Sequence, residues 1–266
     1  MSNIHATAII DPKAKIGANV SIGPYCVIGP HVTLKDGVEL KAHVVVDGHT
    51  TIGENTRVFP FASLGSAPQD LKFHGEPSEL IIGKNNTIRE HATMNPGTEG
   101  GGMKTVVGDD GLFMVGIHVA HDCVIGNRVI MANNATLGGH VHVGDHVLIG
   151  GLAAVHQFIR IGAFAVIGGM SGVESDVIPY GRVKGERAHL AGLNLIGLER
   201  GGVEKDSVKI LQKAMKQLFE GEGTMEQRIE QMSSDYAHDK MVMQMIDFAR
   251  TKERFGLCGP EPRKAA

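Results

Sequence analysis

Histidine, carboxylate and amide side chains recur at steps of eighteen residues through the middle of the sequence. From His121, one step reaches Gly139 and a second reaches Gln157, and the same step leads from Asp122 to His140. An imidazole beside a carboxylate, an amide and a glycine N–H is the composition of a general-base site with an oxyanion donor. The residues expected to line one corner or face are His121, Gly139, His140, His156 and Gln157. A purely structural ladder of polar side chains is the alternative.

Other kinds of chemistry have weaker candidates in this sequence. The run Gly169-Met170-Ser171-Gly172 lies inside a repeat and not at a strand–helix junction, so it is a poor nucleophile elbow. Phosphate-cradling and dinucleotide-binding fingerprints are absent. Zinc held by histidines of stacked coils is the serious alternative, as in γ-class carbonic anhydrases. Those enzymes have a pair of histidines five apart, whereas His118 and His121 are three apart, so we expect no metal and no cofactor.

The interval of eighteen follows from a shorter period in the sequence. An aliphatic residue recurs every six positions, as at Ile10, Ile16, Ile22 and Ile28, and glycine often follows it directly. A six-residue unit suits a short strand and a corner, and such repeats indicate a solenoid. We therefore predict a parallel β-helix in which three hexads close one coil of about eighteen residues. The period does not determine handedness, and ordinary crossover chirality favours a right-handed helix.

Two interruptions and one change of composition divide the chain. Residues 66–80 and 99–105 lose the repeat and are predicted to be loops extruded from the prism; the first carries Gln69, Asp70 and Lys72 and is a candidate wall of the site. We expect the β-helix to occupy residues 1–190 and a helical domain to occupy 191–266. Leu211 and Leu218 are spaced for a helix, Thr224 to Gln227 can form a capping box, and the tail after Arg254 is expected to be loose.

Composition limits the remaining function classes. The 266 residues are 42% hydrophobic with a net charge of −3, which argues against nucleic acid as the main partner. No segment has the apolar length of a transmembrane span, and the first residues lack the pattern of a signal peptide, so a soluble cytoplasmic protein is expected. The three cysteines, Cys26, Cys123 and Cys258, give no disulfide framework.

Several motifs together resemble one family of enzymes. They are Ile22-Gly-Pro-Tyr-Cys-Val-Ile-Gly-Pro30, Gln69-Asp-Leu-Lys72, His118-Val-Ala-His-Asp-Cys123, Ala132-Asn-Asn-Ala-Thr-Leu137, Ala154-Val-His-Gln-Phe158 and Gly192-Leu-Asn194. The combination, which spans nearly the whole chain, resembles the acyl-carrier-protein-dependent UDP-N-acetylglucosamine O-acyltransferases that start lipid A synthesis in Gram-negative bacteria. The resemblance implies a left-handed parallel β-helix with a C-terminal α-helical domain. It also implies a homotrimer with active sites between neighbouring prisms.

The same resemblance implies a direct reaction and a role for each site residue. A long (R)-3-hydroxyacyl group passes from acyl carrier protein to the 3-position of UDP-N-acetylglucosamine. His121 resembles the general base, Asp122 its orienting partner and the Gly139 N–H the oxyanion donor. The residues that resemble substrate-binding positions are Asp70, Lys72, His118, His140, His156 and Gln157, with Asn194 and Arg200 in the region that holds UDP. Gly169 matches the position that sets acyl length, and the neighbouring Met170 can shorten the pocket.

Two departures from the family pattern leave alternatives open. Where close relatives carry His-Arg-Gly-Thr, this chain has Asn95-Pro96-Gly97-Thr98, so the acceptor can be the 3-hydroxyl sugar or its 3-amino analogue. Where relatives carry adjacent arginines, it has Arg200-Gly201, which bears on how the diphosphate is held. Another hexapeptide-repeat acyltransferase is the second enzyme hypothesis. A non-catalytic scaffold is the third, and it predicts outward faces without a concentrated polar cluster.

Overall fold

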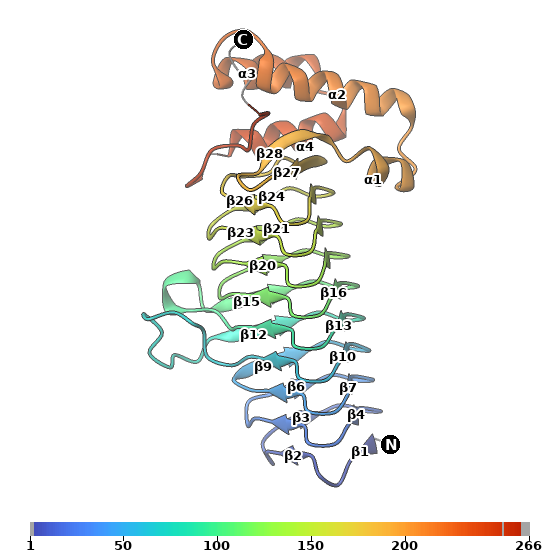
Figure 1. The fold of residues 1–266 in the computed structure, drawn as a ribbon, viewed down its shortest axis with the longest axis vertical. Coiled ribbons are helices and arrows are strands. Elements are labelled where there is room, and N and C mark those ends of the chain that lie inside the picture. Colours follow the sequence, from blue (N-terminus) through green and yellow to red (C-terminus); the bar gives the residue numbers. More distant parts are fainter. Residues whose placement is uncertain (1–2, 252, 262–266) are drawn as a thin grey trace.

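The computed structural model describes residues 3–251 and 253–261 as a long prism of stacked coils with helices at one end (Figure 1). Within the described residues, each coil adds one short strand to each of three sheets, A, B and C. Neighbours within a sheet are every third strand along the chain as far as β26. His118 pairs with Thr136, and Thr136 pairs with Ala154, each eighteen residues further on. The predicted eighteen-residue coil is therefore confirmed.

The strands are short because each turn of the coil has a corner every six residues. The described strands of sheet A are β1 (Asn3–Ile4), β4 (Ser21–Ile22), β7 (Glu39–Leu40), β10 (Arg57–Val58), β13 (Thr87–Ile88), β16 (Leu112–Phe113), β19 (Ile130–Met131), β22 (Leu148–Ile149), β25 (Val166–Ile167), β27 (Gly181–Lys184) and β28 (His189–Leu193). Those of sheet B are β2 (Ile9–Ile10), β5 (Val27–Ile28), β8 (Val45–Val46), β11 (Ser63–Leu64), β14 (Thr93–Met94), β17 (His118–Val119), β20 (Thr136–Leu137), β23 (Ala154–Val155) and β26 (Gly172–Val173). Those of sheet C are β3 (Lys15–Ile16), β6 (Thr33–Leu34), β9 (His49–Ile52), β12 (Glu79–Ile82), β15 (Lys104–Val107), β18 (Val124–Ile125), β21 (His142–Val143) and β24 (Arg160–Ile161).

The core is a continuous stack of aliphatic side chains along the axis of the prism. In most two-residue strands the second residue is buried, as for Ile88, Phe113 and Ile149, and the first faces outward. Burying one such side chain contributes roughly 1.5–3 kcal/mol, so the stack gives each coil its stability. The outward residues and the corners are left free to carry chemistry.

One column of corners is built from residues with positive φ. Asp122, His140 and Phe158 have φ values of 59°, 61° and 67°, and they follow one another at eighteen-residue steps between sheets B and C. Aspartate and histidine are among the residues that tolerate this left-handed conformation. The conformation turns the chain sharply, and the side chains of successive coils come into contact at the corner.

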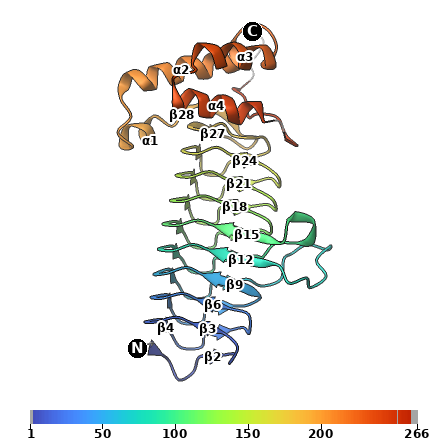
Figure 2. The same ribbon diagram turned by 180° about the vertical axis from the view of Figure 1, so that it is seen from behind.

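Two insertions project from the same side of the prism (Figures 1 and 2). Across the first, Glu79 pairs with His49, thirty residues earlier, and across the second, Lys104 pairs with Glu79, twenty-five residues earlier. The second insertion contains a short 3₁₀ helix, η1 (Glu99–Gly101). Strands β12 and β15 begin inside the ranges 66–80 and 99–105, so both extruded segments end earlier than those ranges.

Helices cover the C-terminal end of the prism. They are α1 (Leu195–Arg200), α2 (Lys205–Glu220), α3 (Met225–Asp235) and α4 (Lys240–Arg250). The predicted capping box is present, because the Thr224 side chain accepts from the Gln227 N–H and the Gln227 side chain accepts from the Thr224 N–H. None of the helices in the described part of the chain is long and apolar enough to cross a membrane.

Helix α4 is attached to the last coil by a buried arginine. The Arg160 guanidinium donates to Asp176 Oδ2 at 2.8 Å and to the Thr251 carbonyl at 2.7 Å, and it lies 4.5 Å from the centre of the Phe248 ring. Because the Arg160 and Asp176 side chains are both largely buried and paired, breaking one would leave the other as an uncompensated buried charge.

The junction between the two parts differs from a simple end of the repeat. β27 and β28 form an antiparallel hairpin. Strand β28 contains position 190, where the sequence predicts the boundary between residues 1–190 and 191–266. That division stays a prediction. The tail is not loose over residues 256–260: the Cys258 N–H donates to the Asp176 carbonyl and the Leu190 N–H to the Gly259 carbonyl. Pro262 and the residues after it lie outside the described residues.

Candidate active site

His121 and Asp122 form a hydrogen-bonded pair at the corner between β17 and β18. The Nδ1 atom of His121 lies 2.7 Å from Oδ2 of Asp122. The Asp122 side chain is 1% exposed and that of His121 is 14% exposed, so the carboxylate is sealed while the imidazole reaches solvent. A neutral His121 that donates its Nδ1–H to Asp122 keeps the lone pair of Nε2 free, which is the arrangement of a general base.

The Asp122 carboxylate is held by several donors. Thr98 donates its backbone N–H to Oδ1 at 2.8 Å and its hydroxyl to Oδ2 at 2.6 Å. The Asp122 N–H in turn donates to the Thr105 hydroxyl. Burial raises the pKa of Asp122, but the hydrogen bonds from His121 and Thr98 outweigh it and hold the pKa below its usual value. Asp122 therefore stays charged beside the imidazole.

Gly139 lies one coil along the prism from His121, directly beside its ring. A Cβ placed on Gly139 would approach His121 Cε1 to 2.6 Å and Nε2 to 2.7 Å. No hydrogen bond within the described residues uses the Gly139 N–H, while the flanking His140 N–H donates to the His121 carbonyl. An N–H group next to the base and free of a protein partner can stabilise a developing oxyanion.

His140 continues the corner and packs between the rings of His121 and Phe158. Its ring meets His121 edge to face at 5.1 Å and stacks on Phe158 at 4.3 Å. The guanidinium of Arg254, from the C-terminal tail, lies 3.9 Å from the centre of the Phe158 ring on the next coil. Burial lowers the pKa of His140 most, so this histidine is neutral near pH 7 and can donate or accept a hydrogen bond.

A cavity of about 420 Å³ opens over these residues. It is lined by Gln69, Asp70, Lys72, His121, His140, Gln157, Phe158 and Arg254. The Asp70 carboxylate, from the first insertion, lies 3.8 Å from Nε2 of His121. The structure thus brings Asp70, Lys72, His140 and Gln157 to the corner that carries His121, although the repeat alone could not place the first two.

His118 and His156 lie beside this cavity and are not among the described residues that line it. His118 faces outward from β17, with Nδ1 2.8 Å from the Thr93 hydroxyl. Burial, and then the charge of His121, lowers the pKa of His118. His156 is exposed and meets the Phe255 ring edge to face at 5.4 Å. Both are close to the corner, and neither reaches His121 directly.

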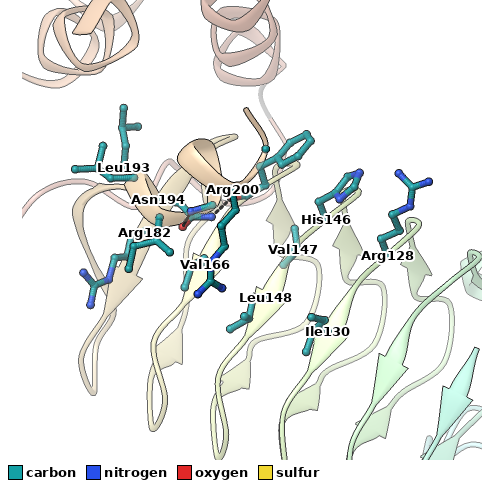
Figure 3. Close-up of a pocket in the computed structure, with 15 residues that line it drawn as sticks. Arg128, Ile130, His146, Val147, Leu148, Val166, Arg182, Leu193, Asn194 and Arg200 are labelled. Carbon is teal, nitrogen blue, oxygen red and sulfur yellow. Dashed lines mark hydrogen bonds between the residues drawn. The ribbon is translucent and has the colours of Figure 1, made fainter. Parts of the chain in front are cut away.

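Asn194 and Arg200 lie at a second cavity of about 920 Å³, on the side of sheet A (Figure 3). Asn194 caps α1 through its Oδ1, which accepts from the Gly197 N–H, and its amide donates to the Phe164 carbonyl. Figure 3 shows Arg200 reaching from α1 toward the strands that carry Leu148 and Val166. A single chain therefore holds Asn194 and Arg200 apart from His121.

The second cavity has a cationic lining. Besides Arg200 it includes Arg128, His146 and Arg182, and none of the described residues that line it is acidic. Among residues 3–251 and 253–261, no ion pair engages the guanidinium group of Arg128, Arg182 or Arg200. Unpaired guanidinium groups around a cavity suit a phosphate-bearing ligand.

Gly169 and Met170 lie at the corner between sheets A and B, away from both cavities. Met170 is 72% exposed, and a Cβ on Gly169 would meet only the Gly151 backbone, at 3.2 Å. The outer face of sheet B connects this corner with His121. Thr136, Ala154 and Gly172 follow one another along that face, so its side chains there are small and uncharged.

A metal ion could in principle use three groups at the catalytic corner. His121, Asp122 and His140 each offer a ligand atom, and these atoms lie within 4.8 Å of one another. The His121 Nδ1 and Asp122 Oδ2 atoms are already hydrogen-bonded to each other, and Asp122 also accepts two bonds from Thr98. This saturation of the carboxylate fits a hydrogen-bonded base better than a metal ligand set.

Sequence reasoning missed four residues of these sites. Thr98 and Phe158 occur inside recognised motifs, but their contacts depend on the geometry of the insertion and of the corner. Arg254 lies in the tail that is expected to be loose. Arg128 is an ordinary charged corner residue in the repeat, and only the cavity that it lines singles it out.

Family models match both ends of the chain. Residues 176–258 match the second domain of UDP-N-acetylglucosamine O-acyltransferase, and residues 1–36 and 13–48 match the bacterial transferase hexapeptide repeat. Among curated proteins, the chain is 52% identical over 259 residues to the acyl-(acyl-carrier-protein)–UDP-N-acetylglucosamine O-acyltransferase of Caulobacter vibrioides, covering 97% of this chain and 98% of that protein. It is 55% identical to the protein of the same name from Rickettsia felis, with 97% of each covered.

Solved structures of UDP-N-acetylglucosamine acyltransferases have the same fold as this chain. A crystal structure of a UDP-N-acetylglucosamine acyltransferase matches with a TM-score of 0.94 at 45% identity, covering 97% of this chain and 99% of the other. LpxA from Acinetobacter baumannii matches with a TM-score of 0.92 at 44% identity, covering 96% and 99%. The predicted fold class, a left-handed parallel β-helix with a helical C-terminal domain, is confirmed, and the right-handed default does not apply.

Proposed function

Because this chain belongs to the acyl-(acyl-carrier-protein)–UDP-N-acetylglucosamine O-acyltransferase family, we propose that it carries out the first acyl transfer of lipid A synthesis with His121 as the general base. Its substrates are acyl-acyl carrier protein and UDP-N-acetylglucosamine. The observation that carries the mechanism is the pair formed by His121 and Asp122, with Nε2 of His121 facing the cavity beside the Gly139 N–H.

The proposed reaction needs no covalent enzyme intermediate. Nε2 of His121 takes the proton of the sugar 3-hydroxyl as its oxygen attacks the thioester carbonyl carbon. A C–O bond forms, and the negative charge on the carbonyl oxygen is stabilised by the Gly139 N–H. The C–S bond then breaks, and the imidazolium returns its proton to the leaving thiolate of the carrier protein. Asp122 stabilises the imidazolium and fixes its tautomer.

The neighbouring side chains are proposed to position the substrates. Asp70, Lys72, His140 and Gln157 line the cavity around Nε2, where they can bind the sugar and the thioester region. Lys72 and Arg254 add positive charge to a cavity that must accept phosphorylated substrates. His118 and His156 are proposed to bind substrate at the edge of the cavity.

The acyl chain is proposed to lie on the outer face of sheet B and to end near Gly169 and Met170. The uncharged side chains of Thr136, Ala154 and Gly172 leave room for it between the two corners. Because Met170 is exposed at the end of this path, its side chain can shorten the space available for a long acyl chain.

A homotrimer would complete the site. Asn194 and Arg200 are proposed to hold the UDP part, yet they lie at the cavity on sheet A, separated from His121 by the width of the prism. If three prisms pack around a common axis, the sheet A cavity of one subunit faces the catalytic corner of the next. We also place the enzyme in the cytoplasm, where its carrier-protein substrate would be found.

Product identification tests the proposal. The protein is incubated with carrier proteins bearing 3-hydroxyacyl chains of different lengths and with either UDP-N-acetylglucosamine or its 3-amino analogue, and products are identified by mass. We expect a 3-O-acylated sugar nucleotide from the hydroxyl substrate. Acylation of the amino analogue alone, or of neither acceptor, would refute the proposed acceptor.

A further inference from the structure

We propose that Thr98 is a positioning residue that clamps the Asp122 carboxylate and thereby sets the orientation and tautomer of His121, a role that rests on the proposed function of His121. Thr98 does not line the catalytic cavity, and its effect is transmitted through Asp122. It is the N-cap residue of η1 and directly precedes the second insertion, which ordinary coils of this prism do not have.

The clamp uses both polar groups of one residue. The Thr98 N–H holds Oδ1 of Asp122 at 2.8 Å, and its hydroxyl holds Oδ2 at 2.6 Å. Because both carboxylate oxygens are engaged, the carboxylate plane cannot rotate without losing a bond. Oδ2 is also the atom that accepts from Nδ1 of His121, at 2.7 Å. The orientation of Asp122 therefore determines the direction of the His121 ring.

The backbone of the insertion makes the clamp rigid and dry. The Gly101 and Met103 N–H groups both donate to the Thr98 carbonyl, at 3.1 and 2.9 Å. A Cβ on Gly101 would lie 1.9 Å from Cγ of Asp122, so the turn closes directly over the carboxylate and leaves no room for a side chain there. Thr98 and Asp122 are both buried. Water cannot replace the Thr98 hydroxyl without opening this turn.

The charged and titratable groups around His121 come from segments of the chain other than the one that carries Thr98. Asp70 faces Nε2 from the first insertion, Asp122 faces Nδ1, and His140 packs against the ring from the next coil. Lys72 and Arg254 line the same cavity. Thr98 is neutral and contacts this set through Asp122, so replacing it changes the geometry of the base without removing a charge.

The test is Thr98→Val, which keeps the backbone N–H and the shape but removes the hydroxyl. We expect kcat to fall about 10-fold while KM for both substrates stays within about twofold, because a misaligned base affects the transition state and not ground-state binding. Thr98→Ser restores kcat. The matched control is Thr56→Val, which removes another buried hydroxyl that donates to the Gly83 carbonyl at 2.9 Å; its melting temperature falls and its kcat does not.

A double variant separates positioning from general destabilisation. In an Asp122→Ala background, Thr98→Val should have no further effect on kcat, because its only route to His121 is gone. The proposal would be overturned if the kcat losses of Thr98→Val and Asp122→Ala multiplied in the double variant. An unchanged kcat in Thr98→Val, or a change in its KM alone, would also overturn it. If Thr98→Val does not fold, the second readout is the ¹⁵N chemical shifts of the His121 ring in Thr98→Ala. If the Nδ1–H tautomer is as populated in that variant as in the wild type, the proposal is overturned. A fully active His121→Ala variant would instead overturn the proposed function.

Discussion

The imidazole of His121 lies against the backbone of Gly139, so closely that a methyl group on Gly139 would come within 2.6 Å of the ring. This contact joins two coils at the corner between sheets B and C. It places a basic nitrogen next to an N–H group that no described protein atom uses. Position 139 therefore has no room for a side chain while the His121 ring keeps this place.

Gly139→Ala should remove most activity while leaving the fold intact. The new methyl group displaces the His121 ring and covers the N–H, so we expect kcat to fall by about 100-fold. The matched control is Gly151→Ala, at the same position of another hexad, where the nearest atom to a new Cβ is 3.3 Å away. Steady-state kinetics and melting temperatures of both variants check this, and equal kcat values for the two would contradict it.

His121→Ala should reduce kcat by roughly 10²–10⁴-fold, the range that a histidine base contributes. Its far-UV circular dichroism should match the wild type, because the side chain is at a corner and outside the core. His31→Ala, which removes an exposed histidine stacked on His49, is the control and should keep full activity. Near-normal turnover in His121→Ala would remove the base from the mechanism.

Mixed oligomers should test whether the site is shared between subunits. His121→Ala and Arg200→Ala, each nearly inactive alone, are co-expressed with different tags and purified as mixed species. If His121 of one subunit works with Arg200 of the next, each mixed trimer regains about one third of its sites. The control is a mixture of the separately purified His121→Ala and Arg200→Ala proteins, assayed before their subunits exchange. Activity no higher than the sum of the separate variants would argue for sites within single chains.

Stability should fall on acidification, beginning near pH 6.5. Burial lowers the pKa values of His118 and His140 below the usual value for histidine, about 6.5, so the unfolded chain binds protons more tightly than the folded one. Their contribution is present above pH 6.5 and is lost as pH falls below it. Asp122, whose pKa is also lowered, adds a loss of stability below the usual value for aspartate, about 3.9. Urea unfolding at pH 7.5, 6.5 and 5.5 checks the first window, and a smaller slope is expected for His118→Asn.

The three cysteines should resist alkylation in the native protein. All are buried and free, and burial raises the pKa of Cys123 to about 12 and that of Cys258 to about 11, so almost no thiolate exists at pH 8. Iodoacetamide should label none of them until denaturant is added, when all three react. Mass spectrometry counts the labels. Rapid native labelling of Cys123 would mean that the coil around it opens readily.

The repeat predicts the fold and one column of candidate site residues because both depend on local spacing. Eighteen-residue steps put His121 beside Gly139 and Asp122 beside His140, as the structure has them. Handedness came only with the resemblance, since a period does not distinguish mirror-image coils. The hairpin β27–β28 follows the last hexad, so the repeat does not predict it; its connection begins with Gly185, at φ 110°.

The contacts made by the insertions and the tail could not be predicted in the same way. The position of Asp70 against His121, and that of Thr98 against Asp122, depend on how segments without a repeat fold back on the prism. Arg254 is separated from Phe158 by almost a hundred residues, and helices α1 to α4 decide where it lies. No local pattern in the sequence carries that information.

Arg254 forms one wall of the cavity but is made late in synthesis, near the C-terminus. The cavity is therefore completed only after the coils that carry His121 have been made. A ribosome makes the coils that hold His121 and Asp122 long before it makes the segment in which Cys258 pairs with Asp176 and Gly259 with Leu190. A nascent chain can therefore possess a correctly oriented imidazole while the opposite wall is still missing. Polypeptides that stop before this segment would be stacked and compact, yet at this corner they would lack the wall that Arg254 forms in the finished protein.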